Sequence, residues 1–251
     1  MTREAGQLWF LAKTVMSPVC RFLWKFEVNG GENVPTDGPA IMAPNHLSVI
    51  DSFFLPVVLD RRITYVGKAE YMDDWKTKYL FPALGMVPID RSGGSASQAA
   101  LDTAARILES GELFGIYPEG TRSRSGNLHK GRTGVARLSM RTGAPIVPVG
   151  LRGTLAVQPP DQPAPKPFMT VQVNFGKPID PSRFRARDGD PLLYREITDE
   201  LMFEIAQLSG QRYVHEYATK DTTTETTSGP ISTVPLAEVR SSADLLSSPA
   251  G

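Results

Sequence analysis

Short apolar runs alternate with amphipathic segments along most of the chain. The runs that predict strands are AIMAP, RITYVGK, MVPI, LFGIY, PIVPVGL and MTVQVNFG, which begin at residues 40, 62, 86, 113, 145 and 169. Apolar positions at helical spacing predict the helices between them, near residues 52–59, 73–84, 97–110, 133–142 and 192–208. Buried strands that alternate with helices are typical of an α/β domain. We therefore expect a mixed, largely parallel sheet flanked by helices.

The first apolar pattern, over residues 7–26, is amphipathic and helical. Charged or hydroxyl side chains interrupt it too often for the ~20 apolar residues that a membrane span needs. Pro18 is expected to kink this helix or divide it in two. The apolar stripe, at about 100° per residue, consists of Leu8, Leu11, Ala12, Val15, Val19, Phe22, Leu23 and Phe26.

Two interpretations of this segment stay open. It lies in a membrane interface, which Trp9 and Trp24 favour because indole prefers the headgroup level, or it packs on the core of its own domain. A cleaved signal peptide is disfavoured, since Lys13 breaks the apolar stretch.

The pattern divides the chain into three parts. Residues 1–27 form the amphipathic segment, and residues 28–218 contain the alternating strands and helices. Residues 219–251 are rich in threonine and serine with little periodicity, and we expect them to be disordered. A proline-rich stretch, residues 157–167, predicts a long loop inside the second part.

Charge changes this picture only locally. The chain balances 27 Lys and Arg against 27 Asp and Glu, which gives no overall preference for nucleic acid. Residues 61–153 nevertheless carry 14 basic against 8 acidic residues, so the middle of the chain favours anionic partners. The single cysteine, Cys20, excludes an internal disulfide and a cysteine-cluster metal site, and it fits a protein that faces the cytosol.

The most informative chemistry follows the strand AIMAP, where the chain reads NHLSVID. On a continuous helix His46 and Asp51 would lie about 140° apart and would not touch. If Ser48 caps a helix that starts there, Asp51 falls in its first turn and can point back toward His46. Two interpretations stay open: Asp51 merely caps its own helix beside a structural histidine, or the pair is a general base and the carboxylate that orients it.

Basic residues follow other predicted strands. Lys68 ends RITYVGK, Arg91 follows MVPI, and Arg122 lies in YPEGTRS after LFGIY. Each has an ordinary interpretation as a solvated surface charge. Because they would share strand exits of one sheet with His46, they also suit a bound phosphate. The two remaining histidines, which we interpret as surface residues, are His129 and His215.

Four stretches, taken in order, resemble the glycerophospholipid acyltransferase family, whose best-known members are the lysophosphatidic acid acyltransferases. That family carries N-H-x-x-x-x-D, a G-x-x-x-[ID]-R block, F-P-E-G-T-R-S and a V-P-[VI] block. Here the blocks stand at residues 45–51, 85–91, 117–123 and 146–150, with Tyr117 in place of the usual phenylalanine. The resemblance covers about residues 28–210, and the order of all four blocks makes it specific.

The resemblance implies acyl transfer in a single displacement. His46 is then the general base that takes the proton of an acceptor hydroxyl, and Asp51 holds its ring. The donor is an acyl-CoA or an acyl carrier protein, with no acyl-enzyme on Cys20 and no metal or cofactor, and residues 146–150 resemble the block placed near that donor. The residues expected to bind the glycerol phosphate of the acceptor, with Lys68 added from its place at a strand end, are Lys68, Arg91, Glu119, Gly120, Thr121 and Arg122.

The leading hypothesis is a 1-acylglycerol-3-phosphate O-acyltransferase of phospholipid biosynthesis, docked by its N-terminal segment on the cytoplasmic face of a membrane. An alternative within this class is transfer to glycerol 3-phosphate or to another lysophospholipid or glycolipid. An alternative of another class is a non-catalytic lipid-binding protein. A serine hydrolase is disfavoured, because the sequence contains no G-x-S-x-G elbow.

Overall fold

A seven-stranded sheet forms the centre of the molecule in the computed structural model, which describes residues 2–68, 86–89, 96–160, 162–187, 190 and 192–219. The strand order is β1-β8-β7-β2-β5-β3-β4. A separate small sheet joins β6 to β9. The strands are β1 (Lys25–Asn29), β2 (Ala40–Pro44), β3 (Ile63–Lys68), β4 (Met86–Ile89), β5 (Leu113–Gly115), β6 (Leu128–His129), β7 (Ile146–Arg152), β8 (Thr170–Phe175) and β9 (Tyr213–Val214).

The predicted mixed, largely parallel sheet is confirmed. From β7 through β2, β5 and β3 to β4, each neighbouring pair of strands is parallel. The other end of the sheet reverses direction, since β8 is antiparallel to β7 and β1 is parallel to β8. The carboxyl ends of the five parallel strands therefore meet at one edge, where ligands of α/β proteins usually bind.

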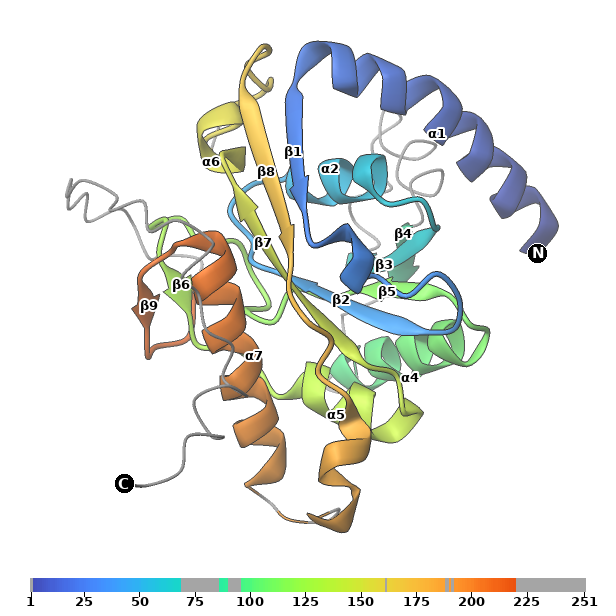
Figure 1. The fold of residues 1–251 in the computed structure, drawn as a ribbon, viewed down its shortest axis with the longest axis vertical. Coiled ribbons are helices and arrows are strands. Elements are labelled where there is room, and N and C mark those ends of the chain that lie inside the picture. Colours follow the sequence, from blue (N-terminus) through green and yellow to red (C-terminus); the bar gives the residue numbers. More distant parts are fainter. Residues whose placement is uncertain are drawn as a thin grey trace.

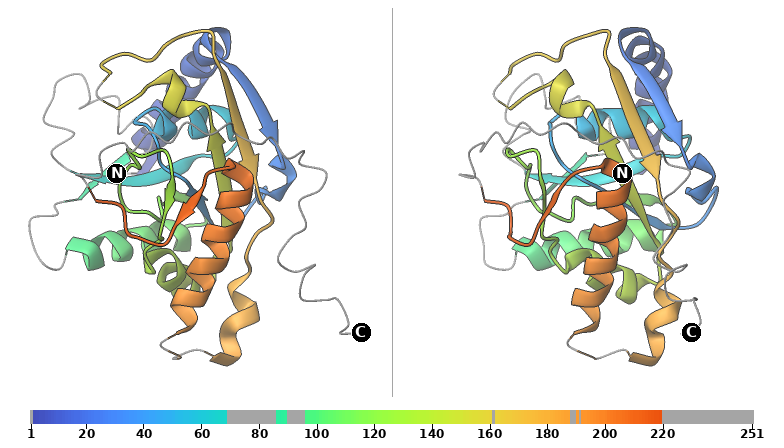
Figure 2. Two further views of the ribbon diagram at one scale, coloured as in Figure 1. Left: turned by 90° about the vertical axis from the view of Figure 1, so that its left-hand side faces the viewer. Right: turned by 60° about the vertical axis from the view of Figure 1, so that its left-hand side comes forward.

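Helices cover both faces of this sheet (Figures 1 and 2). Three of them, α4, α5 and α7, share one core cluster with the sheet, while α1, α2 and the short α6 contribute to the cluster on the opposite face. The helices are α1 (Thr2–Leu23), α2 (Asp51–Val58), α4 (Ala96–Glu109), α5 (Gly134–Thr142), α6 (Thr154–Val157) and α7 (Leu193–Ser209), with 3-10 turns at Gly31–Asn33 and Pro181–Arg187.

The strand β2 lies between the two cores and is buried on both faces. Its side chains alternate, so that Ile41 and Ala43 face the core beneath α4, α5 and α7, whereas Ala40 and Met42 face the core beneath α1 and α2. All four are completely buried. A strand in this position needs apolar residues at every place rather than at alternate ones, which explains the unbroken run AIMAP.

A glycine in β7 sets how closely α7 lies on the sheet. A Cβ atom added at Gly150 would come within 2.3 Å of the backbone carbonyl carbon of Leu208, so no larger residue fits there without moving the helix. This glycine ends the fourth sequence block, PIVPVG, and its place in that block is explained by helix packing.

The N-terminal helix differs from its predicted form at two points. α1 is one continuous helix through Pro18, so of the two outcomes expected there, a kink or a division, the division does not occur. It ends at Leu23 rather than near Phe26, because Phe26 belongs to β1 and pairs with Val171 of β8. The spacing of apolar residues predicted too long a helix. Phe26 falls at a helical spacing from Leu23 by chance, although it belongs to the following strand.

The two sides of α1 have different surroundings. Cys20 is buried in the core, whereas Val15, Val19 and Phe22 are 57%, 48% and 78% exposed. Trp24, which we expected at a membrane interface, is instead buried, and its indole N–H donates to the carbonyl of Lys166 at 2.7 Å. Within the described residues, no helix has both the length and the apolarity to cross a bilayer.

Most of the other predicted elements are found within a few residues of their expected bounds. The helix expected near residues 73–84 and the tail from residue 220 onward lie outside the described residues. The sequence pattern did not predict β1, α6 or the small sheet of β6 and β9, because each is short and depends on partners distant in the chain.

Candidate active site

Two loops meet at the carboxyl edge of the parallel strands. The first follows β2 and carries His46, and the second follows β5 and carries Tyr117 to Ser123. β2 and β5 are parallel neighbours, with Met42 opposite Gly115, so their loops leave the sheet side by side. Hydrogen bonds between the loops then fix the position of the histidine.

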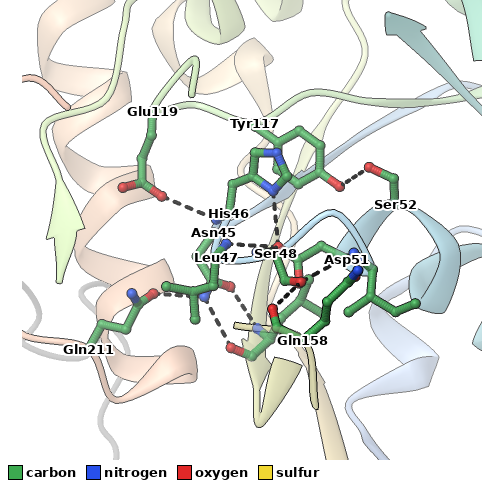
Figure 3. Close-up of polar contacts among 12 residues, drawn as sticks. Asn45, His46, Leu47, Ser48, Asp51, Ser52, Tyr117, Glu119, Gln158 and Gln211 are labelled. Carbon is green, nitrogen blue, oxygen red and sulfur yellow. Dashed lines mark hydrogen bonds and ion pairs between the residues drawn. The ribbon is translucent and has the colours of Figure 1, made fainter. Parts of the chain in front are cut away.

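His46 and Asp51 are in contact, as Figure 3 shows. The Nδ1 atom of His46 lies 3.0 Å from the Oδ2 atom of Asp51. The Asp51 side chain is completely buried, while the His46 side chain is 15% exposed. Because a carboxylate accepts hydrogen bonds, Nδ1 carries the proton and Nε2 keeps a free lone pair, which is the tautomer that a general base requires.

The same carboxylate oxygen turns the chain between the two residues. Oδ2 of Asp51 also accepts the backbone N–H groups of Leu47 and Ser48, both at 2.8 Å. The α-helix begins at Asp51 itself, after a turn over Ser48–Ile50, and not directly at Ser48 as the sequence predicted. Asp51 therefore holds the turn that precedes its helix and contacts His46 with the same oxygen. It does not cap the helix itself, because no side chain makes a capping hydrogen bond at the N-terminus of α2.

The loop after β5 holds the backbone of His46 from both sides. The N–H of His46 donates to Oε1 of Glu119 at 3.1 Å, and the carbonyl of His46 accepts the N–H of Ser123 at 2.7 Å. The other oxygen of Glu119 accepts the N–H of His129 at 2.9 Å. Two sequence blocks that stand more than 70 residues apart are thus joined through one residue.

Glu119 is completely buried, and this burial raises the pKa of its carboxyl to about 7. The two backbone donors lower the pKa, and the negative charge of Asp51 raises it further, but desolvation is the largest effect. Both oxygens are engaged by backbone groups, so in this conformation Glu119 positions the loops. Its expected contact with the glycerol phosphate stays a prediction.

The ring of Tyr117 lies flat against the ring of His46. Their centroids are 3.7 Å apart and the planes differ by 15°. The hydroxyl of Tyr117 is 2.7 Å from that of Ser52, the second residue of α2 (Figure 3). The sequence identified Tyr117 only as a departure from the usual phenylalanine, without a structural role.

Asn45 is a further site residue that the sequence analysis missed. Its side chain is buried, accepts the N–H of Leu151 at 2.7 Å, and donates to the carbonyl of Leu151 at 3.0 Å and to Oε1 of Gln211 at 2.7 Å. The side chain of Gln211 donates in turn to the carbonyl of Gly126. A buried amide directly after an apolar strand is the signal that could have identified Asn45, since such a group must find partners.

Of the three basic residues expected to bind the phosphate, two lie within the described residues and one lies outside them. Lys68 ends β3, opposite Ile89 of β4 at the same edge of the sheet. Arg91 lies outside the described residues. Arg122 is partly exposed and stands next to Ser123, which bonds to His46.

Gly120 and Thr121 form the bend between the buried Glu119 and Arg122. The backbone of Gly120 has φ 76°, a conformation that favours glycine, and a Cβ there would come within 2.9 Å of Nε of Arg132. Arg132 is therefore a further cation at this loop, and the sequence analysis did not identify it. Thr121 is partly exposed beside it.

The interpretation of His129 as a surface residue is wrong. His129 is buried, with its Nε2 atom 3.0 Å from the hydroxyl of Ser125, and it belongs to β6, which pairs with β9. That pairing joins residues far apart in the chain and leaves no local signal. His215 is exposed, as expected, and its Nε2 atom lies 3.2 Å from Nζ of Lys130.

Cys20 lies in the core beneath α1, and burial raises the pKa of its thiol. A buried thiol of raised pKa is a poor nucleophile. Among the described residues, no group of three or more His, Cys, Asp or Glu side chains is arranged to hold a metal ion.

A family model described as Acyltransferase matches residues 25–152, just over half of the 251 residues. The chain belongs to the Acyltransferase family. The matched range begins at β1 and ends with β7, so it contains the complete loop pair around His46.

Relatives of this acyltransferase include two proteins named as 1-acyl-sn-glycerol-3-phosphate acyltransferases. The chloroplastic LPAT1 of Arabidopsis thaliana is 28% identical over 175 residues, covering 69% of this chain and 49% of its own length. A probable enzyme of Mycoplasma pneumoniae is 26% identical over 204 residues, covering 74% and 76%. The chain spans about half the length of the first plant relatives it matches.

A solved structure shares the fold. The 1-acyl-sn-glycerophosphate (LPA) acyltransferase PlsC from Thermotoga maritima superimposes with a TM-score of 0.59 at 23% identity, covering 80% of this chain and 78% of its own. This chain therefore has the α/β architecture of that structure, with a largely parallel sheet between helices.

We predict that the buried carboxyl of Glu119 makes stability depend on pH. Its pKa is about 7 in the folded chain against a reference value of 4.5, so between these values the folded state keeps a proton that the unfolded state has lost. The free energy of unfolding should therefore fall as pH rises from 5 to 8, by on the order of 3 kcal/mol. Urea unfolding of wild type and Glu119→Gln across this range measures the effect.

The difference between the two profiles isolates Glu119 from other titrating groups. The Gln variant should lose this component of the slope, because it has no proton to release. Glu32→Gln, at an exposed position, is the matched control and should keep the wild-type slope. Parallel profiles for wild type and Glu119→Gln would contradict the assigned pKa.

Proposed function

We propose that this acyltransferase moves a fatty acyl group from acyl-CoA or acyl carrier protein to the free hydroxyl of lysophosphatidic acid and so forms phosphatidic acid. The observation that carries the proposal is the 3.0 Å contact between Nδ1 of His46 and Oδ2 of Asp51. With the proton on Nδ1, Nε2 has the lone pair that a general base needs. Several relatives named for this reaction support the choice of acceptor.

The reaction needs one base and no covalent acyl-enzyme. The acceptor hydroxyl oxygen attacks the thioester carbonyl carbon while its proton passes to Nε2 of His46. The tetrahedral intermediate then collapses, the C–S bond breaks, and the thiolate leaves with the proton that the imidazolium returns. Asp51 stabilises the imidazolium in between, since its Oδ2 atom already accepts from Nδ1. The burial of Cys20 is consistent with direct transfer to the acceptor.

We predict that His46→Ala lowers kcat by roughly 10²–10⁴-fold, the usual contribution of a general base. Asp51→Asn should cost nearly as much, because an amide cannot fix the same tautomer or stabilise the imidazolium. The measurement is mass spectrometry of the products that purified protein forms from mixed acyl-CoAs and a panel of lyso-acceptors and glycerol 3-phosphate.

Two exposed residues provide matched controls for these changes. His215→Ala and Asp37→Asn repeat the same substitutions away from the site and should keep wild-type turnover. A folded His46→Ala protein with wild-type turnover would exclude the mechanism and would favour a lipid-binding role without catalysis. Products on an acceptor other than lysophosphatidic acid would change the proposed substrate and leave the mechanism in place.

The acceptor phosphate binds beside the loop after β5. Arg122 is partly exposed there, one residue from Ser123, which holds the carbonyl of His46. Lys68 is the last residue of β3, and Arg91 follows the neighbouring strand β4 in the chain. Arginine binds phosphate through paired donors, so Arg122 can orient the glycerol hydroxyl relative to Nε2 of His46.

We predict that Arg122→Gln raises KM for lysophosphatidic acid by roughly 10–100-fold, the value of one charge-assisted hydrogen bond. KM for an acceptor without a free phosphate should change little. Initial rates with both acceptors measure the effect, and Arg106→Gln on α4 is the matched control. An equal loss on the two acceptors would assign Arg122 to the structure of the loop rather than to phosphate recognition.

The membrane surface is the partner that supplies the lipid acceptor, and the enzyme docks on its cytoplasmic face. The exposed side of α1 supports this docking, because it presents Val15, Val19 and Phe22 to solvent. Phe168 lies beside it, 75% exposed, with its ring 6.4 Å from that of Phe22. Its backbone has φ 61°, and its N–H donates to the carbonyl of Leu23. A strained backbone that holds an aromatic ring in water points to a function for that ring.

We predict that Phe22→Ser and Phe168→Ser each weaken binding to phosphatidylglycerol-containing vesicles by about tenfold or more, through lost apolar burial. Turnover of dispersed short-chain substrates should stay unchanged. Vesicle sedimentation measures binding, and Phe203→Ser, at a residue 42% exposed on α7 across the sheet, is the control. Equal losses with vesicles and dispersed substrates would indicate a packing role for the two phenylalanines.

A further inference from the structure

Three aromatic rings form a stack at the site. The rings of Tyr117 and His46 are 3.7 Å apart between centroids, with 15° between their planes. The ring of Tyr65, on β3, also stacks on that of Tyr117, with 6.0 Å between the ring centroids and 16° between the planes. A Cβ at Gly115 would come within 2.1 Å of the Tyr65 ring, so this glycine is what allows Tyr65 to lie against β5. The stack therefore rests on the sheet itself.

The middle ring of the stack is also tied to the helix that carries the carboxylate. The hydroxyl of Tyr117 is within hydrogen-bond distance of Ser52, at 2.7 Å. Ser52 directly follows Asp51 at the start of α2. A movement of α2 that displaced Asp51 would thus carry the stacked ring with it.

Two contacts constrain different motions of the imidazole. Rotation of a histidine about χ2 is broad, without sharply separated wells. The hydrogen bond to Asp51 selects which edge of the ring faces the carboxylate, but it permits the plane to tilt around that bond. The flat face of Tyr117 restricts that tilt. Together the two contacts fix the direction in which the lone pair of Nε2 points.

We propose that Tyr117 is a positioning residue for His46, with its ring fixing the plane of the imidazole and its hydroxyl coupling that plane to α2 through Ser52. The proposal rests on His46 being the general base. When His46 takes the proton of the acceptor, the imidazolium lies over the face of the tyrosine ring, and a cation in that position is attracted to the ring. Tyr117 thus favours the same protonated state as Asp51.

Substitutions at Tyr117 separate the ring from the hydroxyl. Tyr117→Leu removes the flat face and should lower kcat by roughly 10–100-fold with little change in KM, as expected for a misdirected catalytic group. Tyr117→Phe keeps the ring and should stay within about fivefold of wild type, the value of one neutral hydrogen bond. Ser52→Ala should match Tyr117→Phe, and the double variant should lose no more than either alone, because both remove the same bond.

A distant tyrosine controls for general destabilisation. Tyr194 on α7 packs on the core and faces Arg137, whose guanidinium is 4.9 Å from its ring centroid. Tyr194→Leu makes the same chemical change on the opposite face of the sheet and should leave kcat unchanged. A Tyr117→Leu protein with wild-type kcat, or with the same profile as Tyr194→Leu, would overturn the proposal.

The ring proton resonances of His46 give a readout that does not depend on turnover. The chain has three histidines, and the spectrum of His46→Ala assigns the resonances of His46. The ring current of Tyr117 should shift these resonances upfield in wild type and in Tyr117→Phe, and the shift should vanish in Tyr117→Leu. Unchanged resonances in Tyr117→Leu would overturn the stack. Failure of the proposed function would appear separately, as equal turnover by wild type and His46→Ala.

Discussion

A carboxylate removed entirely from water must find its hydrogen-bond donors within the chain, and the site depends on how Asp51 meets this requirement through one of its two oxygens, since Oδ1 is buried without a partner. Its Oδ2 atom collects the N–H groups of Leu47 and Ser48 and the Nδ1 atom of His46. An unpaired buried charge is costly, so the chain reversal after β2 and the tautomer of the histidine follow from the same condition. The three hydrogen bonds to Oδ2 therefore both shape the loop and orient the imidazole of His46.

The sheet supplies the second level of support. β2 lies between β7 and β5, so the loop after it receives a neighbour on each side. Glu119 and Ser123, in the loop after β5, hold the backbone of His46. Leu151 of β7 binds the side chain of Asn45. A reactive side chain at the centre of a parallel sheet can thus be fixed through its backbone while Nε2 remains available.

Sequence reasoning recovers the elements whose pattern is local. The apolar runs, the helices near residues 97–110 and 133–142 and the position of His46 after a strand can all be predicted, because each is set by neighbours within a few residues. The features that the sequence did not reveal depend on partners far along the chain. They are the pairing of β6, which contains His129, with β9, the hydrogen bond from Asn45 to Gln211, and the strand β1, which needs β8. The double role of Asp51, which holds the turn before α2 and contacts His46, also escapes a one-dimensional pattern.

The bond between Asn45 and Gln211 joins residues 166 positions apart. During synthesis the histidine loop leaves the ribosome long before Gln211 does, so the last support for that loop arrives only when the domain is nearly finished. Contacts of such wide separation form late and slow the folding of a domain. Full support of the histidine loop is therefore coupled to the synthesis of Gln211, and a nascent chain that ends before this residue lacks one side-chain partner of Asn45.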